Sequence, residues 1–192
     1  RPSGRGCGGS RTPPPAAAPA PAPSDGSLKK FAFAGENAQV TFVGAKVTGK
    51  HDGGFRVVKG SIDLPATGLE GARVEVTIDM TSVYTDAEKL TGHLQSPDFF
   101  DVAQFPEAKF VATTFAPGEN GLTTVTGDLT LHGVTKTISF PATITSTADA
   151  ATARAEFGLN RKDFGIVYPV MPDDLIADEV LLRFDIKAAP GA

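Results

Sequence analysis

The chain has 192 residues, of which 41% are hydrophobic and 21% are charged, a composition typical of a globular protein with one domain and a tail. Its formal charge of −4 at pH 7, without a cluster of basic residues in the sequence, argues against nucleic acid as a partner. Its single cysteine, Cys7, excludes an intrachain disulfide and a cysteine-rich zinc site.

Residues 1–27 are predicted to be a disordered tail. They hold almost half of the 15 prolines and none of the 13 phenylalanines. Such a segment cannot bury enough apolar surface to offset the conformational entropy lost on ordering. The prolines and alanines up to Pro23 favour an extended polyproline II linker. The folded domain is therefore expected over residues 28–192.

From residue 39 onward, apolar and polar residues alternate with a period of two, which is typical of strands that bury one face. Within 72–80, for example, Val74, Val76 and Ile78 face one way and their polar neighbours face the other. Eight strands are predicted on this basis, over residues 39–47, 55–64, 72–80, 108–116, 122–132, 136–145, 152–160 and 178–188. Turns at 52–54, 118–121 and 132–133 are expected to supply the positive φ angles that hairpins require.

Residues 81–106 interrupt the alternation and are predicted to form a helical insertion. Asp86 is expected to cap a short helix over residues 87–95, and Pro97 is expected to end it. The segment 98–101 then resembles a helical turn that packs two aromatic side chains against an apolar surface. A connection of this length is usually functional or covers an opening.

Eight antiparallel strands with polar outer faces are expected to close into a barrel, because closure removes the unpaired edges of the sheet. The expected fold is all-β, an eight-stranded antiparallel barrel with a short helical insertion between strands 3 and 4. The interior of such a barrel is either filled or holds one small ligand. Small residues on the apolar faces either match the taper of the barrel or leave room for a guest, and they are Ala108, Ala112, Gly127, Ala142, Ala153 and Ala155.

Four stretches of the sequence resemble, in the expected order, the motifs of one protein family. They are Gly54-Phe55 with Val57-Val58-Lys59-Gly60, the segment 86–101 with Phe105-Pro106 and Phe110, the segment 126–136, and Asn160-Arg161-Lys162-Asp163-Phe164-Gly165. On these stretches, residues 28–190 resemble the YceI-like family of polyisoprenoid-binding, lipocalin-like proteins. The family commonly has a basic residue shortly before the histidine of the insertion, whereas Leu90-Thr91-Gly92 precede His93 here, so a head-group role for that basic residue does not carry over.

The resemblance implies a non-enzymatic protein of the bacterial envelope, secreted to the periplasm, whose lipocalin-like barrel encloses an apolar channel. The implied ligand is an isoprenoid lipid, such as a polyprenyl lipid or the tail of a quinone, and no other cofactor is expected. The residues expected to line the channel lie on apolar faces of different strands and are Phe42, Val76, Ile78, Phe110, Leu129, Phe140, Phe157, Leu182 and Phe184. Phe99 and Phe100 are candidates for a lid over one end, or alternatively part of a helix packed on the barrel.

Two other interpretations stay open on the residues alone. One is a structural or interaction domain whose barrel is solid and has no ligand. The other is an enzyme that uses His93 or Asp163 at the mouth of the barrel. The sequence contains no Gly-x-Ser-x-Gly motif, so it gives no support to nucleophilic catalysis.

Four polar residues lie within the family-like motifs, namely His93, His132, Arg161 and Asp163. They are candidates for contacts with a ligand head group, or alternatively for hydrogen bonds and ion pairs that hold turns. The third histidine, His51, is 42 residues from His93, and these spacings match no metal-binding pattern, so no metal site is predicted.

Cys7 is followed by two glycines, a serine and the proline-rich linker, which resembles the start of a mature bacterial lipoprotein. In that interpretation, acyl chains on Cys7 tether the domain to a membrane, and two or more chains are needed for stable anchoring. The alternative is a free thiol without a role. The sequence does not decide between a monomer and a homodimer.

Overall fold

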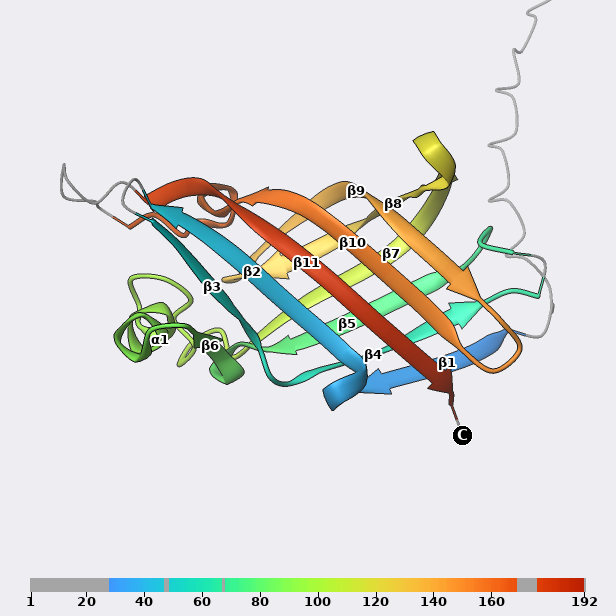
Figure 1. Ribbon diagram of the computed structural model, residues 1–192, viewed down its shortest axis with the longest axis horizontal. Helices are drawn as coiled ribbons and strands as arrows, with labels where there is room; N and C mark the ends of the chain where they lie inside the picture. Colours follow the sequence, from blue (N-terminus) through green and yellow to red (C-terminus); the bar gives the residue numbers. More distant parts are fainter. Residues whose placement is uncertain (1–27, 47–48, 67, 169–175, 192) are drawn as a thin grey trace, which may run out of the picture.

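The computed structural model describes residues 28–46, 49–66, 68–168 and 176–191, which form one antiparallel sheet and a short helix (Figure 1). The strands are β1 (Lys29–Ala34), β2 (Ala38–Lys46), β3 (Gly49–Phe55), β4 (Val58–Leu64), β5 (Arg73–Asp79), β6 (Val83–Thr85), β7 (Glu107–Pro117), β8 (Thr123–Leu131), β9 (Val134–Ser146), β10 (Ala151–Asn160) and β11 (Ile176–Pro190). The helix is α1 (Glu88–Gln95), and the 3-10 turns are η1 (Gly35–Asn37), η2 (Met80–Ser82), η3 (Glu119–Gly121) and η4 (Arg161–Phe164). The predicted tail and Cys7 lie outside the described residues.

The sheet closes into a barrel because β1 pairs with two strands. Phe31 lies opposite Ile62 of β4 and also opposite Pro190 of β11. The strand order β1-β4-β5-β7-β8-β9-β10-β11 therefore returns to its first strand. Strands β2, β3 and β6 continue the walls of β1, β4 and β5 beyond short bends. The predicted eight-stranded antiparallel barrel with a short helical insertion is confirmed.

Strand β8 illustrates how the alternation produces this barrel. Val125, Gly127 and Leu129 are buried inside, whereas the residues between them point to the outer face. On that outer face the Thr137 hydroxyl donates a hydrogen bond of 2.6 Å to the Asp128 carboxylate. Such cross-strand pairs stabilise a sheet while its inner face is buried.

The prediction of a turn at residues 52–54 is wrong. These residues belong to β3 and pair with β2, and none of them has a positive φ. A Cβ atom at Gly53 would collide with the Phe42 ring and would lie 2.7 Å from the Tyr84 carbonyl oxygen. The glycine thus allows β2, β3 and β6 to pack closely, rather than reversing the chain. The turns at 118–121 and 132–133 are confirmed by positive φ angles at Asn120, Gly121, His132 and Gly133.

The helical insertion is present, but Asp86 does not cap the helix. The helix begins at Glu88, and its N-cap residue, Ala87, makes no side-chain capping bond. The Asp86 carboxylate instead lies 3.0 Å from Nδ1 of His51 on β3, so a contact with a distant strand takes the place of the helix cap. The helix ends at Gln95, two residues before the predicted stop at Pro97, and Ser96 is its C-cap.

The two ends of the barrel interior are packed differently. At the end containing β1 and the C-terminal half of β11, which we call the packed end, Ala112, Ala142 and Ala188 are at most 4% exposed. A Cβ atom at Gly127 would collide with the Val111 carbonyl oxygen, so the walls approach closely there. These small residues thus allow close packing at this end, and none of them lines the cavity described below. The opposite end, which carries α1 and η4, is called the cavity end below.

Candidate functional site

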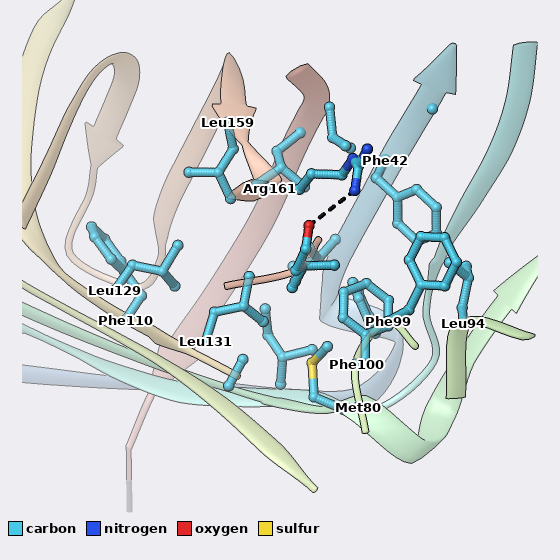
Figure 2. A pocket seen from close by; sticks show the side chains of 18 of the residues that line it. Phe42, Met80, Leu94, Phe99, Phe100, Phe110, Leu129, Leu131, Leu159 and Arg161 are labelled. Atoms are coloured by element: carbon cyan, nitrogen blue, oxygen red, sulfur yellow. Dashed lines mark hydrogen bonds between the residues drawn. The ribbon is translucent and has the colours of Figure 1, made fainter. Parts of the chain in front are cut away.

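An apolar cavity of about 140 Å³ lies inside the cavity end of the barrel (Figure 2). Residues from eight strands line it, together with residues from α1, η2, η4 and the turn after α1. Figure 2 shows Leu94 and Phe99 from the helical insertion on one side, facing Leu129 and Leu131 from β8 on the other. All the lining residues are apolar or glycine, except for His51 and Arg161.

The structure brings ten of the predicted lining residues together around this cavity, namely Phe42, Ile78, Phe99, Phe100, Phe110, Leu129, Phe140, Phe157, Leu182 and Phe184. Val76 is not among the lining residues. It is 2% exposed and lies opposite Gly60 of β4 and Phe110 of β7, on the side toward the packed end. Alternation identifies the face of a strand, but it does not say at which level along the barrel axis a cavity begins.

Sequence reasoning missed several lining residues that a known pattern could have found. Leu131, Leu159 and Val180 continue the alternation of predicted residues two positions away. Leu90 and Leu94 stand four residues apart on α1 and therefore share one helix face. Met80 also lines the cavity; it lies in η2 but continues the alternation of Val76 and Ile78. Ile166 lines the cavity too, but it follows η4, where no period marks an inward face.

Three phenylalanines from neighbouring strands form a nearly parallel row across the cavity wall. The Phe140 and Phe157 rings have centroids 4.1 Å apart and an interplanar angle of 7°. Phe184 continues the row, 5.7 Å from Phe157 with an interplanar angle of 6°. Aromatic pairs of this kind add about 0.5–1.5 kcal/mol beyond the burial of their area. The row presents flat ring surfaces to whatever occupies the cavity.

Arg161 is the charged residue that lies deepest in the lining. Arg161 is the first residue of η4, and its side chain is 6% exposed. Its guanidinium donates to the carbonyl oxygens of Ile166 at 2.9 Å and Ala177 at 3.3 Å, and to the Asp178 carboxylate at 3.3 Å. Figure 2 shows Arg161 among the lining residues, with its hydrogen bond of 2.9 Å drawn as a dashed line. The arrangement keeps a buried cation paired, as burial of a charge requires.

The other predicted polar contacts lie away from the lining. Asp163 is exposed and pairs with Lys136 at 3.2 Å. Nδ1 of His132 lies 3.2 Å from the Phe164 carbonyl oxygen, so this histidine joins the β8–β9 turn to η4. Nε2 of His93 lies 3.6 Å from the Asp98 carboxylate. These three side chains hold turns together in the structure.

An aromatic cluster fastens the helical insertion to the segment after η4. His93 packs edge-on against Phe99 and against Tyr168, with centroid distances of 5.0 and 4.9 Å. Phe99 is 5% exposed and lies both in this cluster and in the cavity lining. The insertion therefore covers the cavity end, in the position expected of a lid.

On the outer face, a bond from Lys109 lowers the pKa of Glu75 below its usual value of 4.5, with Nζ 2.6 Å from the carboxylate. The Arg73 guanidinium, 3.5 Å away, acts in the same direction. None of these three residues lines the cavity.

In the described part of the chain, no group of three or more metal-ligating side chains is gathered, and no helix is long and apolar enough to cross a membrane.

Comparison with known proteins identifies relatives of this chain. The family model of the YceI-like domain matches residues 31–188. A UPF0312 protein of Pseudomonas savastanoi pv. phaseolicola is 38% identical over 123 residues, which are 61% of this chain and 64% of the relative. A UPF0312 protein of Pseudomonas fluorescens is 37% identical over 147 residues, 71% of this chain and 74% of the relative. The chain thus spans a little under two thirds of the first of these relatives.

Solved structures share the fold. The crystal structure of BcnA from Burkholderia cenocepacia has a TM-score of 0.71 and 24% identity, covering 79% of this chain and 96% of BcnA. The structure of a polyisoprenoid binding domain from Saccharophagus degradans, implicated in plant cell wall breakdown, has a TM-score of 0.67 and 18% identity, covering 86% of this chain and 100% of that domain. At these identities the likeness establishes the barrel architecture.

Proposed function

The chain belongs to the family of YceI-like domains, and from this membership we propose that its barrel binds an isoprenoid lipid without catalysing a reaction. The observation that carries the proposal is the lining of the cavity, which is apolar apart from His51 and Arg161. A hydrocarbon chain is the ligand class that such a lining favours, because each methylene removed from water contributes about 0.8 kcal/mol. The polyisoprenoid binding domain from Saccharophagus degradans, which has the same fold, supports this ligand class.

The size of the cavity indicates how much of the isoprenoid lipid it holds at once. Its volume of about 140 Å³ is close to that of apolar cavities of about 150 Å³ that bind benzene. One isoprene unit has five carbons, so its burial would contribute about 4 kcal/mol. To hold more than one isoprene unit, the cavity must widen through rotamer changes of lining side chains. Phe100 and Phe157 are suited to this because they are only partly buried.

We place the head group of the lipid near Arg161. Its guanidinium carries five N–H donors, and Ile166, Ala177 and Asp178 each accept one bond. A quinone carbonyl or a phosphate oxygen is a suitable acceptor for the donors left over. His93 and Asp163 pair with other residues and do not line the cavity, which supports Arg161 rather than either of them as the head-group contact. Their positions also argue against a catalytic acid or base at the mouth of the barrel.

The proposed setting is the bacterial cell envelope, with the domain secreted to the periplasm and tethered to a membrane through acylated Cys7. The lipoprotein-like segment at 6–10 and the proline-rich linker after it support this part of the proposal. Intact mass spectrometry of the protein from a bacterial membrane fraction tests it, because acyl chains add a defined mass to Cys7. Native mass spectrometry of the same sample separates a monomer from a homodimer.

The ligand is tested by organic extraction of the purified chain, followed by mass spectrometry of the extract and titration with a polyprenyl lipid and a quinone. An isoprenoid in the extract, or saturable binding of either compound, is the expected result. Leu159→Gln, which places an amide in the apolar lining, should weaken binding at least tenfold. Thr126→Gln, on the outer face, is the matched control. An empty protein that binds neither compound would favour a barrel with a purely structural or interaction role.

A further inference from the structure

Strands β9 and β10 pair along only part of their length. Their ladder runs from Ser146 opposite Ala151 to Ala142 opposite Ala155 and, within the described residues, stops there. Beyond that point the ladder partner of β9 is β8 and that of β10 is β11. The two strands separate toward the cavity end (Figure 1). We call the wall between residues 134–141 and residues 156–160 the β9–β10 seam.

The sequence accounts for the place where the ladder stops. The next residue of β9 after the last pair is Pro141, which has no backbone N–H and cannot donate to a neighbouring strand. Each strand is still paired on its other side along this stretch. In the β10–β11 ladder, for example, Gly158 lies opposite Leu181, and in the β8–β9 ladder Ser139 lies opposite Thr126. The seam is therefore a place where the wall can widen without breaking a ladder of backbone hydrogen bonds.

Side chains close the seam on its inner side. If the register continued, Phe157 would lie opposite Phe140 and Leu159 opposite Ile138. The rings of Phe140 and Phe157 do meet there, stacked with centroids 4.1 Å apart. All four of these residues line the cavity, so the seam and the cavity share one boundary.

The seam is bounded at both ends. At one end the β9–β10 ladder begins at Ala142 and Ala155. At the other end, the ion pair between Lys136 and Asp163 at 3.2 Å joins β9 to η4, and His132 contacts the Phe164 carbonyl oxygen. Between these limits the wall depends on side-chain packing, which gives the seam the form of a window in the side of the barrel.

Among the described residues, several contacts hold the helical insertion over the cavity end. There the helical insertion is held by the cluster of His93, Phe99 and Tyr168, and by the contact of Asp86 with His51. Opening that end requires the insertion to leave several partners together. Opening the seam requires side chains to move rather than an element to leave, and the Phe157 ring that stacks across it is only partly buried.

We infer that an apolar chain reaches the cavity through the β9–β10 seam, and that the Phe157 ring is the gate of this passage. The inference rests on the proposed function, since it assigns a route to the same ligand. It predicts that an isoprenoid chain enters sideways through the wall, between Ile138 and Leu159, while the helical insertion stays in place.

The test locks the seam in a Cys7→Ser background with the pair Ser139→Cys and Gly158→Cys, which face outward on opposite sides of it. A Cβ atom at position 158 meets the flexible end of the Glu179 side chain, which can move aside. The control pair, Thr143→Cys with Arg154→Cys, joins directly opposed residues in the paired part of the same two strands. Loading is followed with a fluorescent polyprenyl probe supplied from detergent micelles, before and after oxidation.

Oxidation of the seam pair should slow loading at least tenfold, reduction should restore the rate, and the oxidised control pair should load at the rate of the parent. A bis-maleimide bridge between the same thiols replaces the disulfide if oxidation is incomplete. Phe157→Leu should speed both loading and release. If the locked seam loads at the unlocked rate, the passage lies elsewhere. If even the unlocked protein fails to bind the probe at equilibrium, it is the proposed function that fails.

Discussion

The ring of Phe99 stacks on the ring of Tyr168, with centroids 5.0 Å apart and an interplanar angle of 24°. Phe99 belongs to the turn after α1 and Tyr168 to the segment after η4, so two parts of the chain far apart in sequence close one end of the cavity together. Stacking of this kind contributes about 0.5–1.5 kcal/mol beyond burial. Because Tyr168 lies outside the helical insertion, substituting it tests how much this contact stabilises the insertion.

Replacing Tyr168 by alanine should loosen the insertion while the barrel stays folded. The expected result is severalfold faster amide hydrogen exchange across α1, because Phe99 and His93 lose the ring that both contact. Exchange in β8 should not change. Val167→Ala is the control, because Val167 is 61% exposed. Equal exchange in α1 for both variants would show that the stack does not hold the insertion.

Two alanines on β7 separate the cavity end from the packed end. Ala108 lines the cavity, whereas Ala112 is fully buried at the packed end. Ala108→Leu should fill the cavity and weaken probe binding at least tenfold with little loss of stability. Ala112→Leu should instead lower the free energy of unfolding by about 1–3 kcal/mol, because it overpacks a filled region. Chemical denaturation and equilibrium binding check the pair, and similar destabilisation by both variants would contradict the division of the interior.

Arg161→Met should destabilise the protein as well as affect ligand binding. The change removes the guanidinium donor from the carbonyl oxygens of Ile166 and Ala177, and loss of the partner of a buried acceptor costs about 1–3 kcal/mol. Lys162→Met removes the neighbouring cation, which pairs with the same Asp178 from an exposed position. That surface pair should contribute at most about 1 kcal/mol. Thermal unfolding of both variants gives the comparison, and equal losses would show that Arg161 has no structural role.

Glycine serves different purposes at positions 127 and 92. A Cβ atom at Gly127 would lie 2.6 Å from the Ala112 Cα atom, so Gly127→Ala should cost about 1–3 kcal/mol through displacement of β7 from β8. A Cβ atom at Gly92, within α1, would meet nothing within 4 Å. Gly92→Ala should therefore stabilise the helix by about 0.5–1 kcal/mol. Denaturation midpoints that shift in the same direction for both variants would contradict this account.

The pKa of Glu75 should be measurably below 4.5 in the folded protein, because Lys109 and Arg73 stabilise its carboxylate. A group whose pKa is lowered by folding adds stability above its unfolded value, and this contribution disappears as the pH falls through the folded value. The effect should be small, because the cluster faces solvent. Titration followed by NMR checks the shift, and Lys109→Met should raise the pKa of Glu75 toward 4.5. Lys59→Met, which removes a lysine paired with Glu107 instead, should leave it unchanged.

The sequence was informative wherever one period governed a segment. The alternation in strands such as β5 and β8 predicted the barrel and the inward face of eight cavity residues, because a pleated strand sends every second side chain to the same side. It failed at Asp52-Gly53-Gly54, where composition resembles a turn but the glycines make room for the Phe42 ring and the Tyr84 carbonyl. It also failed at Asp86, whose partner His51 is distant in sequence.

By itself, the sequence determined the strand faces, the barrel class and the presence of a helical insertion, since these follow from local periodicity and from the need to bury apolar surface. Tertiary structure alone decided where the interior is filled and where it is hollow. Val76 and Ile78 have the same pattern on one strand, yet only Ile78 lines the cavity. The physical reason is that a cavity depends on how side chains from many strands meet across the barrel axis, which no local period of the sequence records.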